Sequence, residues 1–172
     1  MEVAILRLLH IVSGILWVGG AFLFGIFLIP AVREAGPAGG PVMGGMVKRK
    51  LPLWIAVFAI VTILCGLRLF MINVGGSPEY LFSPTGICLL IGATFALVAF
   101  AFGMAVQRPT ADKMGKLGAA IQAQGTPPSA EQQAEMKRLS GIIGKVAKRT
   151  AILLLHAAIF MAGSRLAGTL FQ

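Results

Sequence analysis

Four long apolar stretches dominate the chain, and less apolar segments separate them. The stretches cover residues 3–32, 51–74, 86–106 and 150–172. A helix rises about 1.5 Å per residue and the hydrocarbon core of a bilayer is about 30 Å thick, so each stretch is long enough to cross a membrane as a helix. The pattern therefore predicts an all-α integral membrane protein, a four-helix bundle that forms one domain over residues 1–172.

The connection between the third and fourth stretches is longer than the others and shows helical periodicity. Its apolar residues recur at the spacing of one helix face: Met114, Leu117 and Ile121. Ser129 and Gln132 then form a capping-box pattern that begins another helix, which continues into the last stretch without a breaker. We expect a helical hairpin over about residues 110–148 that extends spans three and four, with a break at Pro109.

The charged residues are few and unevenly placed. Only 12% of the chain is charged, whereas about 25% is usual for a soluble domain, and the net charge is +9. Twelve of the 15 basic residues lie in the connections after spans one and three: Arg33, Lys48, Arg49, Lys50, Arg108, Lys113, Lys116, Lys137, Arg138, Lys145, Lys148 and Arg149. These connections share one side of a four-span protein. The positive-inside rule predicts that this side is cytoplasmic and that both termini face the periplasm of a bacterial inner membrane. Anionic lipid then explains the basic excess, and nucleic acid is not expected as a partner.

Polar and aromatic residues share one face of the first span. At the three- and four-residue spacing of a helix stripe lie Arg7, His10, Gly14, Trp17 and Ala21, with Ser13 beside them. Small and polar residues in membrane helices face the inside of a bundle, because lipid disfavours polar groups. An ionisable ring is costly in this setting, which makes His10 a candidate functional residue. It is expected about 10 Å from the outer boundary.

Arg68 and His156 extend this candidate chemistry to other spans. Arg68 lies at an outer-half depth similar to that of His10, and His156 lies about 10 Å from the cytoplasmic edge. Neutral imidazole is a good ligand for haem iron or copper, and arginine suits haem propionates. Two alternatives remain: Arg7 and Arg68 snorkel to lipid headgroups, or each histidine only hydrogen-bonds to a neighbouring helix. A depth difference on the order of 10 Å argues against one metal ion bound by both histidines.

Sulfur ligands give a weaker copper signal. Met43 and Met46 form an M-x-x-M pattern in the glycine-rich first connection, while Cys65 and Cys88 fall within spans two and three. Thioether and thiolate ligands select Cu(I). The alternative is that the two methionines are incidental and that the cysteines are small buried apolar residues.

The stretch Leu9–Gly20, LHIVSGILWVGG, resembles the first helix of a group of small bacterial membrane proteins. The group includes the copper-resistance protein D family, the HemJ protoporphyrinogen oxidases and the membrane domain of cytochrome-linked urate oxidase. Residues 49–54 and 125–129 look most like relatives of copper-resistance protein D. The HemJ-like and urate-oxidase-like branches imply haem b with His10 as its ligand, and the copper-resistance branch implies copper handling. The chain has fewer intramembrane polar groups than HemJ and lacks the urate oxidase partner domain, so we do not expect an enzyme by itself.

These observations predict a small haem b membrane protein that passes or senses electrons with a redox partner. The residues expected at the haem are His10 as axial ligand, His156 as candidate second ligand, Arg7 and Arg68 at the propionates, and Trp17 packed on the macrocycle. Ser13 is a further candidate for cofactor binding. One alternative is a copper-handling permease that uses Met, Cys and His side chains. Another is a non-catalytic subunit of a larger membrane complex or of a homo-oligomer.

Overall fold

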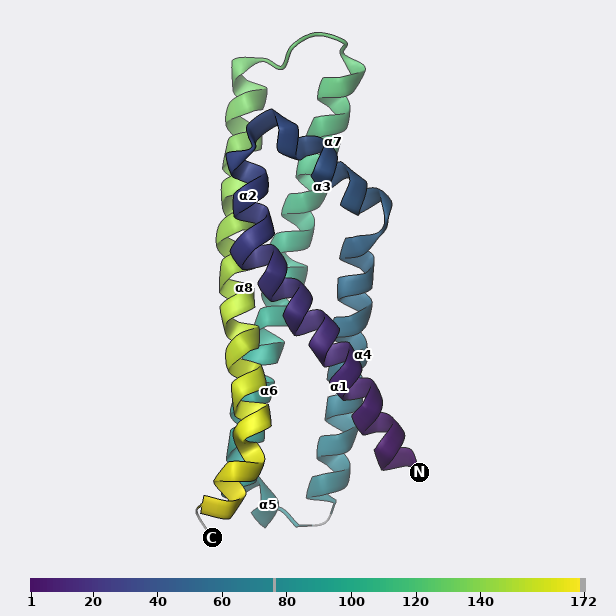
Figure 1. Cartoon of the computed structure of the whole chain (residues 1–172), viewed down its shortest axis with the longest axis vertical. Coiled ribbons are helices and arrows are strands. Elements are labelled where there is room, and N and C mark those ends of the chain that lie inside the picture. The colour runs from purple at the N-terminus through teal and green to yellow at the C-terminus, as the bar shows by residue number, and fades with distance from the viewer. Residues whose placement is uncertain (76, 171–172) are drawn as a thin grey trace.

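The computed structural model describes residues 1–75 and 77–170, and all regular elements in this part are helices. Four long helical rods run along the molecule (Figure 1). The first contains α1 (Glu2–Phe22), the π-helical segment η1 (Leu23–Leu28) and α2 (Ile29–Glu34), and the second is α4 (Leu51–Val74). The third contains α6 (Pro84–Phe102), the π-helical segment η3 (Gly103–Gln107) and α7 (Arg108–Ala123), and the fourth is α8 (Ala130–Leu170). Shorter helices connect the rods: η2 (Gly36–Ala38), α3 (Gly39–Lys48) and α5 (Glu79–Phe82).

Each rod contains a segment that is long and apolar enough to span a membrane, so the predicted all-helical fold with four such helices is confirmed. The second span was predicted at 51–74, and α4 has these same bounds. The first and third rods are longer than their predicted spans, because polar residues continue each helix beyond its apolar part. Residues 171 and 172 of the fourth predicted span lie outside the described residues.

The third rod continues through Pro109, where a break was expected. A proline has no N–H group, and its ring crowds the carbonyl group four residues earlier. Here η3 ends two residues before Pro109, and η1 ends two residues before Pro30 in the same way. A π-helical turn moves the backbone hydrogen bond from the fourth to the fifth residue, so a helix can continue where the regular pattern fails.

The rods associate as two pairs that α1 joins. Helix α4 packs along α1, and α6 packs along α8. Helix α1 starts beside α4 and crosses toward α8, so that its C-terminal half and η1 lie against α8 (Figure 1). Within residues 1–75 and 77–170, α4 forms no comparable interface with α6 or α8. The molecule is therefore a bundle with one shared crossing region, and the pairs are largely separate elsewhere.

Glycines allow the close helix contacts on α8. A Cβ atom on Gly92 of α6 would lie 2.8 Å from Cγ of Met161 and 3.1 Å from the carbonyl oxygen of Ala157. A Cβ atom on Gly25 of η1 would lie 2.5 Å from the carbonyl oxygen of Ala147. Small residues bring membrane helices together in this way, because van der Waals packing rather than the hydrophobic effect drives their association.

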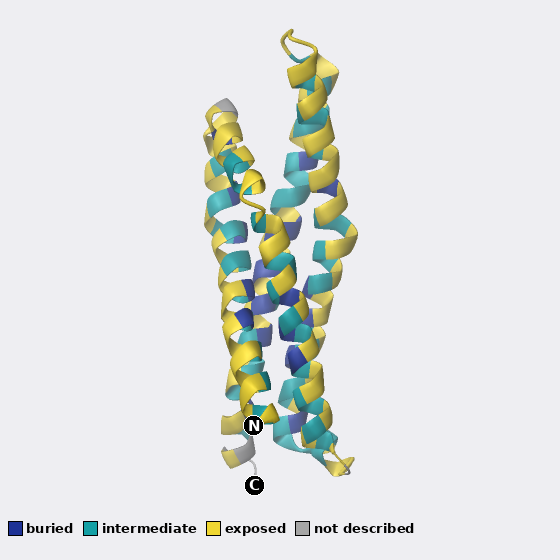
Figure 2. Ribbon diagram, turned by 90° about the vertical axis from the view of Figure 1, so that its right-hand side faces the viewer, coloured by how far each residue is buried: buried dark blue, intermediate teal, exposed yellow. Residues whose placement is uncertain are grey.

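All four rods contribute to the core where the two pairs meet. The core consists of Trp17, Ala59, Ala96, Ala99, Leu154 and Ala157. Trp17 is only 4% exposed, and the edge of its ring meets Phe100 with 6.4 Å between the ring centroids. Buried residues concentrate in the middle of the molecule, whereas exposed residues cover its outer faces (Figure 2). Many exposed residues in the spans are large and apolar, as expected of surfaces that face lipid.

Helices α7 and α8 run beside each other beyond the apolar segments. Helix α8 has 41 residues, so it is about 62 Å long, twice the thickness of the hydrocarbon core. The amides of Gln124 and Gln132 bond to each other at 3.1 and 3.0 Å near the tip. The Ser129 N–H donates to the Gln132 side chain at 2.8 Å, and the Gln132 N–H donates to the Ser129 hydroxyl at 3.2 Å. The predicted capping box is therefore confirmed.

Candidate functional site

His10 lies on the side of α1 that packs against α4. Its Nδ1 atom is 2.8 Å from the carbonyl oxygen of Thr62. A carbonyl oxygen can only accept, so Nδ1 carries a hydrogen, and in the neutral form of the ring the lone pair is then on Nε2. Histidines that bind metals show the same arrangement, in which a backbone carbonyl fixes one ring nitrogen and the other nitrogen is the ligand.

Gly66 makes the room for this ring on α4. A Cβ atom at Gly66 would lie 2.7 Å from Cε1 and 3.0 Å from Nδ1 of His10, which is closer than side-chain atoms normally approach. The imidazole therefore lies directly on the α4 backbone, between the Thr62 carbonyl and Gly66. Sequence reasoning missed Gly66, because one glycine in an apolar helix carries no sign of which residue will pack on it.

Hydroxyl groups connect α1 and α4 one turn further along. The hydroxyl oxygens of Ser13 and Thr62 are 2.8 Å apart, and the two residues are only 5% and 8% exposed. Each hydroxyl also lies within hydrogen-bond distance of a carbonyl in its own helix, Leu9 for Ser13 and Phe58 for Thr62. Ser13, a candidate for cofactor binding from the sequence, thus forms an interhelical contact that holds the register of the two helices around His10.

The other residues predicted around a haem at His10 have different surroundings. Arg68 is paired with Glu2, with its Nη2 and Nε atoms 2.8 and 2.9 Å from Oε1 of the carboxylate. This ion pair joins the N-terminal end of α1 to the C-terminal end of α4. Arg7 is exposed, and no carboxylate in the described residues lies within ion-pair distance of it. Trp17 is part of the core against Phe100, two helical turns from His10.

His156 is exposed on the outer surface of α8. Its Nδ1 atom lies 2.8 Å from the carbonyl oxygen of Ile152, one turn earlier in the same helix. The neutral ring again keeps its lone pair on Nε2. Phe95 of α6 lies beside the imidazole, with 5.5 Å between ring centroids, and stacks on Phe160 at 5.9 Å.

The structure does not bring the two histidines together. His10 belongs to the contact between α1 and α4, whereas His156 lies on the surface of the α6–α8 pair. The contacts of each ring come from different helices. A haem bound by both rings of one chain therefore finds no support in this arrangement.

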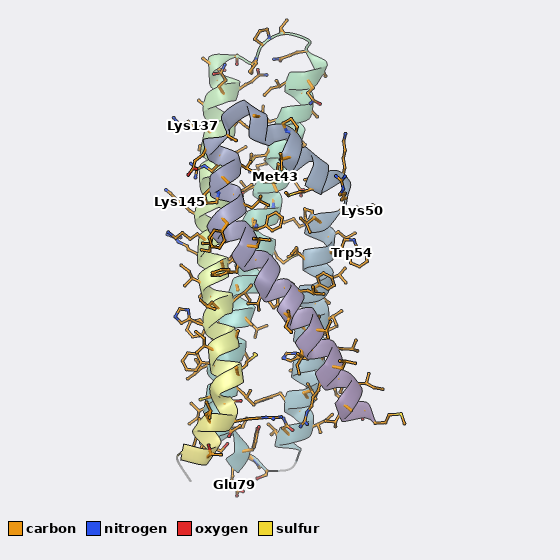
Figure 3. The ribbon with its side chains drawn as sticks, in the orientation of Figure 1. Met43, Lys50, Trp54, Glu79, Lys137 and Lys145 are labelled. Atoms are coloured by element: carbon orange, nitrogen blue, oxygen red, sulfur yellow. The ribbon has the colours of Figure 1, made fainter. Side chains whose placement is uncertain are left out.

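The sulfur residues are also dispersed. Met43 and Met46 lie on α3, which is a helix where a glycine-rich loop was expected (Figure 3 labels Met43). Cys65 is buried on α4, Cys88 lies on α6, and both are free thiols. In the part of the chain that the structure describes, no three His, Cys, Asp or Glu side chains come together as a metal-ion site.

Two open hollows lie elsewhere on the surface. One, of about 370 Å³, is lined by Pro30, Arg33 and Glu34. The other, of about 250 Å³, is lined by Phe102 of α6 and by Arg149, Ile152 and Leu153 of α8. Ile152, whose carbonyl oxygen lies 2.8 Å from Nδ1 of His156, lines the second hollow, whereas His156 itself does not.

Comparisons of this chain with protein families, with curated proteins and with solved structures find no match. The resemblance of the first helix to copper-resistance protein D, HemJ and the urate oxidase membrane domain stays an expectation. Function is therefore argued from the geometry of the side chains.

Proposed function

We propose that this chain is a small multi-pass membrane protein that holds one haem b through His10 and passes electrons within the membrane. The observation that carries this proposal is the environment of the His10 ring. The neighbouring helix fixes Nδ1 with the Thr62 carbonyl, and Gly66 leaves space for the ring, so the ring has a defined orientation. Among the described residues, no hydrogen bond engages Nε2. A hydrogen bond from Nδ1–H also raises the basicity of the ligating nitrogen.

The residues present fit one axial ligand from this chain. His10 supplies the nitrogen, and the apolar side chains of the spans suit a macrocycle. Arg7 lies one turn before His10 and has no carboxylate partner in the described residues, which makes it the first candidate for a propionate. Arg68 would have to exchange Glu2 for a propionate. A haem held there would supply reversible one-electron chemistry at its iron, and His156 of the same chain would not be expected to hold it, because that ring lies on the α6–α8 pair.

The charge distribution supports an orientation in which His10 lies in the outer half of the membrane. Lys50, Lys137 and Lys145 lie toward the end of the molecule that carries α3 and the α7–α8 extension, whereas Glu79 lies at the opposite end (Figure 3). Basic residues concentrate on the cytoplasmic side of bacterial membrane proteins. The proposal therefore places α7 in the cytoplasm, both termini in the periplasm, and the protein in the inner membrane.

The test is the visible absorption spectrum of protein purified in mild detergent from a haem-replete host. The proposal predicts a Soret band, sharp α and β bands after dithionite reduction, and about one haem per chain. A redox titration should then give one reversible one-electron transition. A colourless protein with full helical content by circular dichroism would contradict the proposal.

A further inference from the structure

Arg33 of α2 is the first basic residue after the first apolar stretch of the chain. Its side chain lies on the backbone of α8 at Gly144. The Nη1 and Cδ atoms are 3.0 and 3.9 Å from the position that a Cβ atom would take there. A larger residue at position 144 would meet this side chain, so the glycine provides the space for it. The guanidinium therefore lies at the joint between α2 and α8, where the apolar part of the first rod ends.

Two lysines of α8 add positive charge near this joint. Lys145 follows Gly144 directly, Lys148 comes one helical turn later, and both are exposed (Figure 3 labels Lys145). In the described residues, no carboxylate lies within ion-pair distance of either lysine or of Arg33. Neighbouring like charges repel one another, so a bound anion would stabilise this end of the α2–α8 contact.

An open hollow of about 370 Å³ lies beside Arg33, and its lining residues are Pro30, Arg33 and Glu34. Arg33 and Pro30 belong to one face of the first rod, which continues to the partly exposed Ile26 one turn earlier. This face changes from apolar to cationic along its length. A ligand that follows it would need an apolar part beside Ile26 and Pro30 and an anionic part at Arg33, which is the chemistry of a phospholipid.

We propose that the joint between α2 and α8 binds one anionic phospholipid with a hydroxylated headgroup, of which phosphatidylglycerol is the simplest. Its phosphate accepts hydrogen bonds from the guanidinium of Arg33, and the two lysines of α8 add to the positive potential. An acyl chain follows the apolar face of the first rod. Glu34 lines the same hollow and can only accept when ionised, so the headgroup hydroxyls supply the donors that it needs.

This site goes beyond the proposed electron transfer and does not depend on it. Arg33 belongs to α2, whereas His10 belongs to α1 near the N-terminus, so the two residues lie toward opposite ends of the first rod (Figure 1). The site also differs from the general attraction between basic residues and an anionic membrane surface. That attraction depends on charge alone, whereas the site requires the space that Gly144 leaves for one particular arginine.

The experiment measures lipid binding to the full-length protein by native mass spectrometry. Delipidated protein in detergent is titrated with phosphatidylglycerol or phosphatidylcholine of the same acyl chains. We expect one phosphatidylglycerol per chain at concentrations where phosphatidylcholine stays unbound. Arg33→Gln should weaken this binding about tenfold, as expected for one lost hydrogen bond from a charged donor. Arg138→Gln is the matched control, because it removes the same charge from an arginine that is already paired with Glu135 at 2.7 Å, and binding should stay unchanged.

A second pair of variants keeps the net charge constant. Gly144→Leu fills the space that the side chain of Arg33 occupies on α8, so it should weaken phosphatidylglycerol binding although no charge is lost. Gly141→Leu is its control. In the described part of the chain, no atom beyond its own helix backbone and chain neighbours lies within 4 Å of a Cβ atom at position 141. Circular dichroism checks that both variants keep the helical content of the wild type.

Three results would overturn the inference. The first is equal binding of phosphatidylglycerol and phosphatidylcholine by the wild type. The second is an equal loss of binding in a variant and its control, either Arg33→Gln with Arg138→Gln or Gly144→Leu with Gly141→Leu, which would show that surface charge or bundle stability alone determines lipid binding. The third is displacement of phosphatidylglycerol by an equal concentration of inorganic phosphate, which would identify a free anion as the ligand.

Discussion

His10 and His156 are both histidines in apolar helices, but they differ in the helix that supplies the carbonyl partner of the ring. Both Nδ1 atoms lie 2.8 Å from a backbone carbonyl oxygen. For His10 this oxygen belongs to Thr62 of another helix, and Gly66 provides the space. For His156 it belongs to Ile152 of the same helix, and the ring faces outward. An intrahelical bond can form in an isolated helix, whereas the His10 arrangement exists only after α1 and α4 have packed.

The two helix pairs are also held together by different means. Polar contacts between α1 and α4 surround His10, with the hydroxyl pair of Ser13 and Thr62 and the ion pair of Glu2 and Arg68. The contact of α6 with α8 depends on close backbone approach at Gly92. Polar interhelical bonds fix the rotation and register of a helix, and an imidazole that binds a metal needs such a fixed orientation. The ring of His156 lies on the surface and has no interhelical hydrogen bond of this kind.

The largest effect is expected from Trp17→Ala, because Trp17 lies where both pairs meet. Loss of this 4% exposed side chain should lower the free energy of unfolding by about 3 kcal/mol. Trp54 of α4 is 54% exposed, so Trp54→Ala is the matched control and should cost much less. Denaturant titrations in detergent micelles measure both. An equal loss in the free energy of unfolding for the two variants would mean that Trp17 does not hold the α1–α4 pair against the α6–α8 pair.

Gly66→Ala should disturb the ring of His10 and leave the ring of His156 unchanged. The added methyl group would lie 2.7 Å from Cε1 of His10, so the ring or the helix must move, at a cost of about 1–3 kcal/mol in stability. Haem content should fall with it, and the ¹⁵N signal of His10 should shift while that of His156 stays. Gly163→Ala is the control, since in the described part of the chain no atom beyond its own helix backbone and chain neighbours lies within 4 Å of a Cβ atom there. Similar behaviour of both variants would contradict the role given to Gly66.

A smaller effect is expected at the hydroxyl pair. In a double-mutant cycle of Ser13→Ala and Thr62→Val, the coupling free energy should be about 0.6 kcal/mol, the average for interhelical hydrogen bonds in membranes. Unfolding titrations of the wild type, both single variants and the double variant give this number. Strictly additive effects would show that the hydroxyls do not interact.

The ion pair of Glu2 and Arg68 should matter least for stability. Both side chains are more than half exposed, so Arg68→Gln should cost about 0.5 kcal/mol or less, and high salt should reduce the difference. Unfolding titrations at low and high ionic strength test this. Haem content is the sharper readout, because a fall in haem at unchanged stability would assign Arg68 to a propionate.

The spans were predictable from sequence because apolar length is a local property. The bounds 51–74 of α4 were found this way, as was the capping box at Ser129. The π-helical turns before Pro30 and Pro109 were not, since a proline signals a disturbance of the helix and not how the chain accommodates it.

The candidate site was predictable only on the helix that carries His10. The spacing on α1 placed Arg7, His10 and Trp17 toward other helices; His10 and Trp17 do contact another helix, whereas Arg7 is exposed. Their partners on other helices depend on rotation and register, which no pattern within one span reveals. For this reason Gly66 was missed, and the pairing of Arg68 with Glu2 was not considered.

The most direct test of the distinction between the two histidines is the haem content per chain of His10→Ala and His156→Ala, purified side by side with the wild type. We predict that His10→Ala loses the Soret band while His156→Ala keeps about one haem per chain. Retention of haem in His10→Ala, or equal loss in both variants, would contradict the assignment of His10 as the ligand.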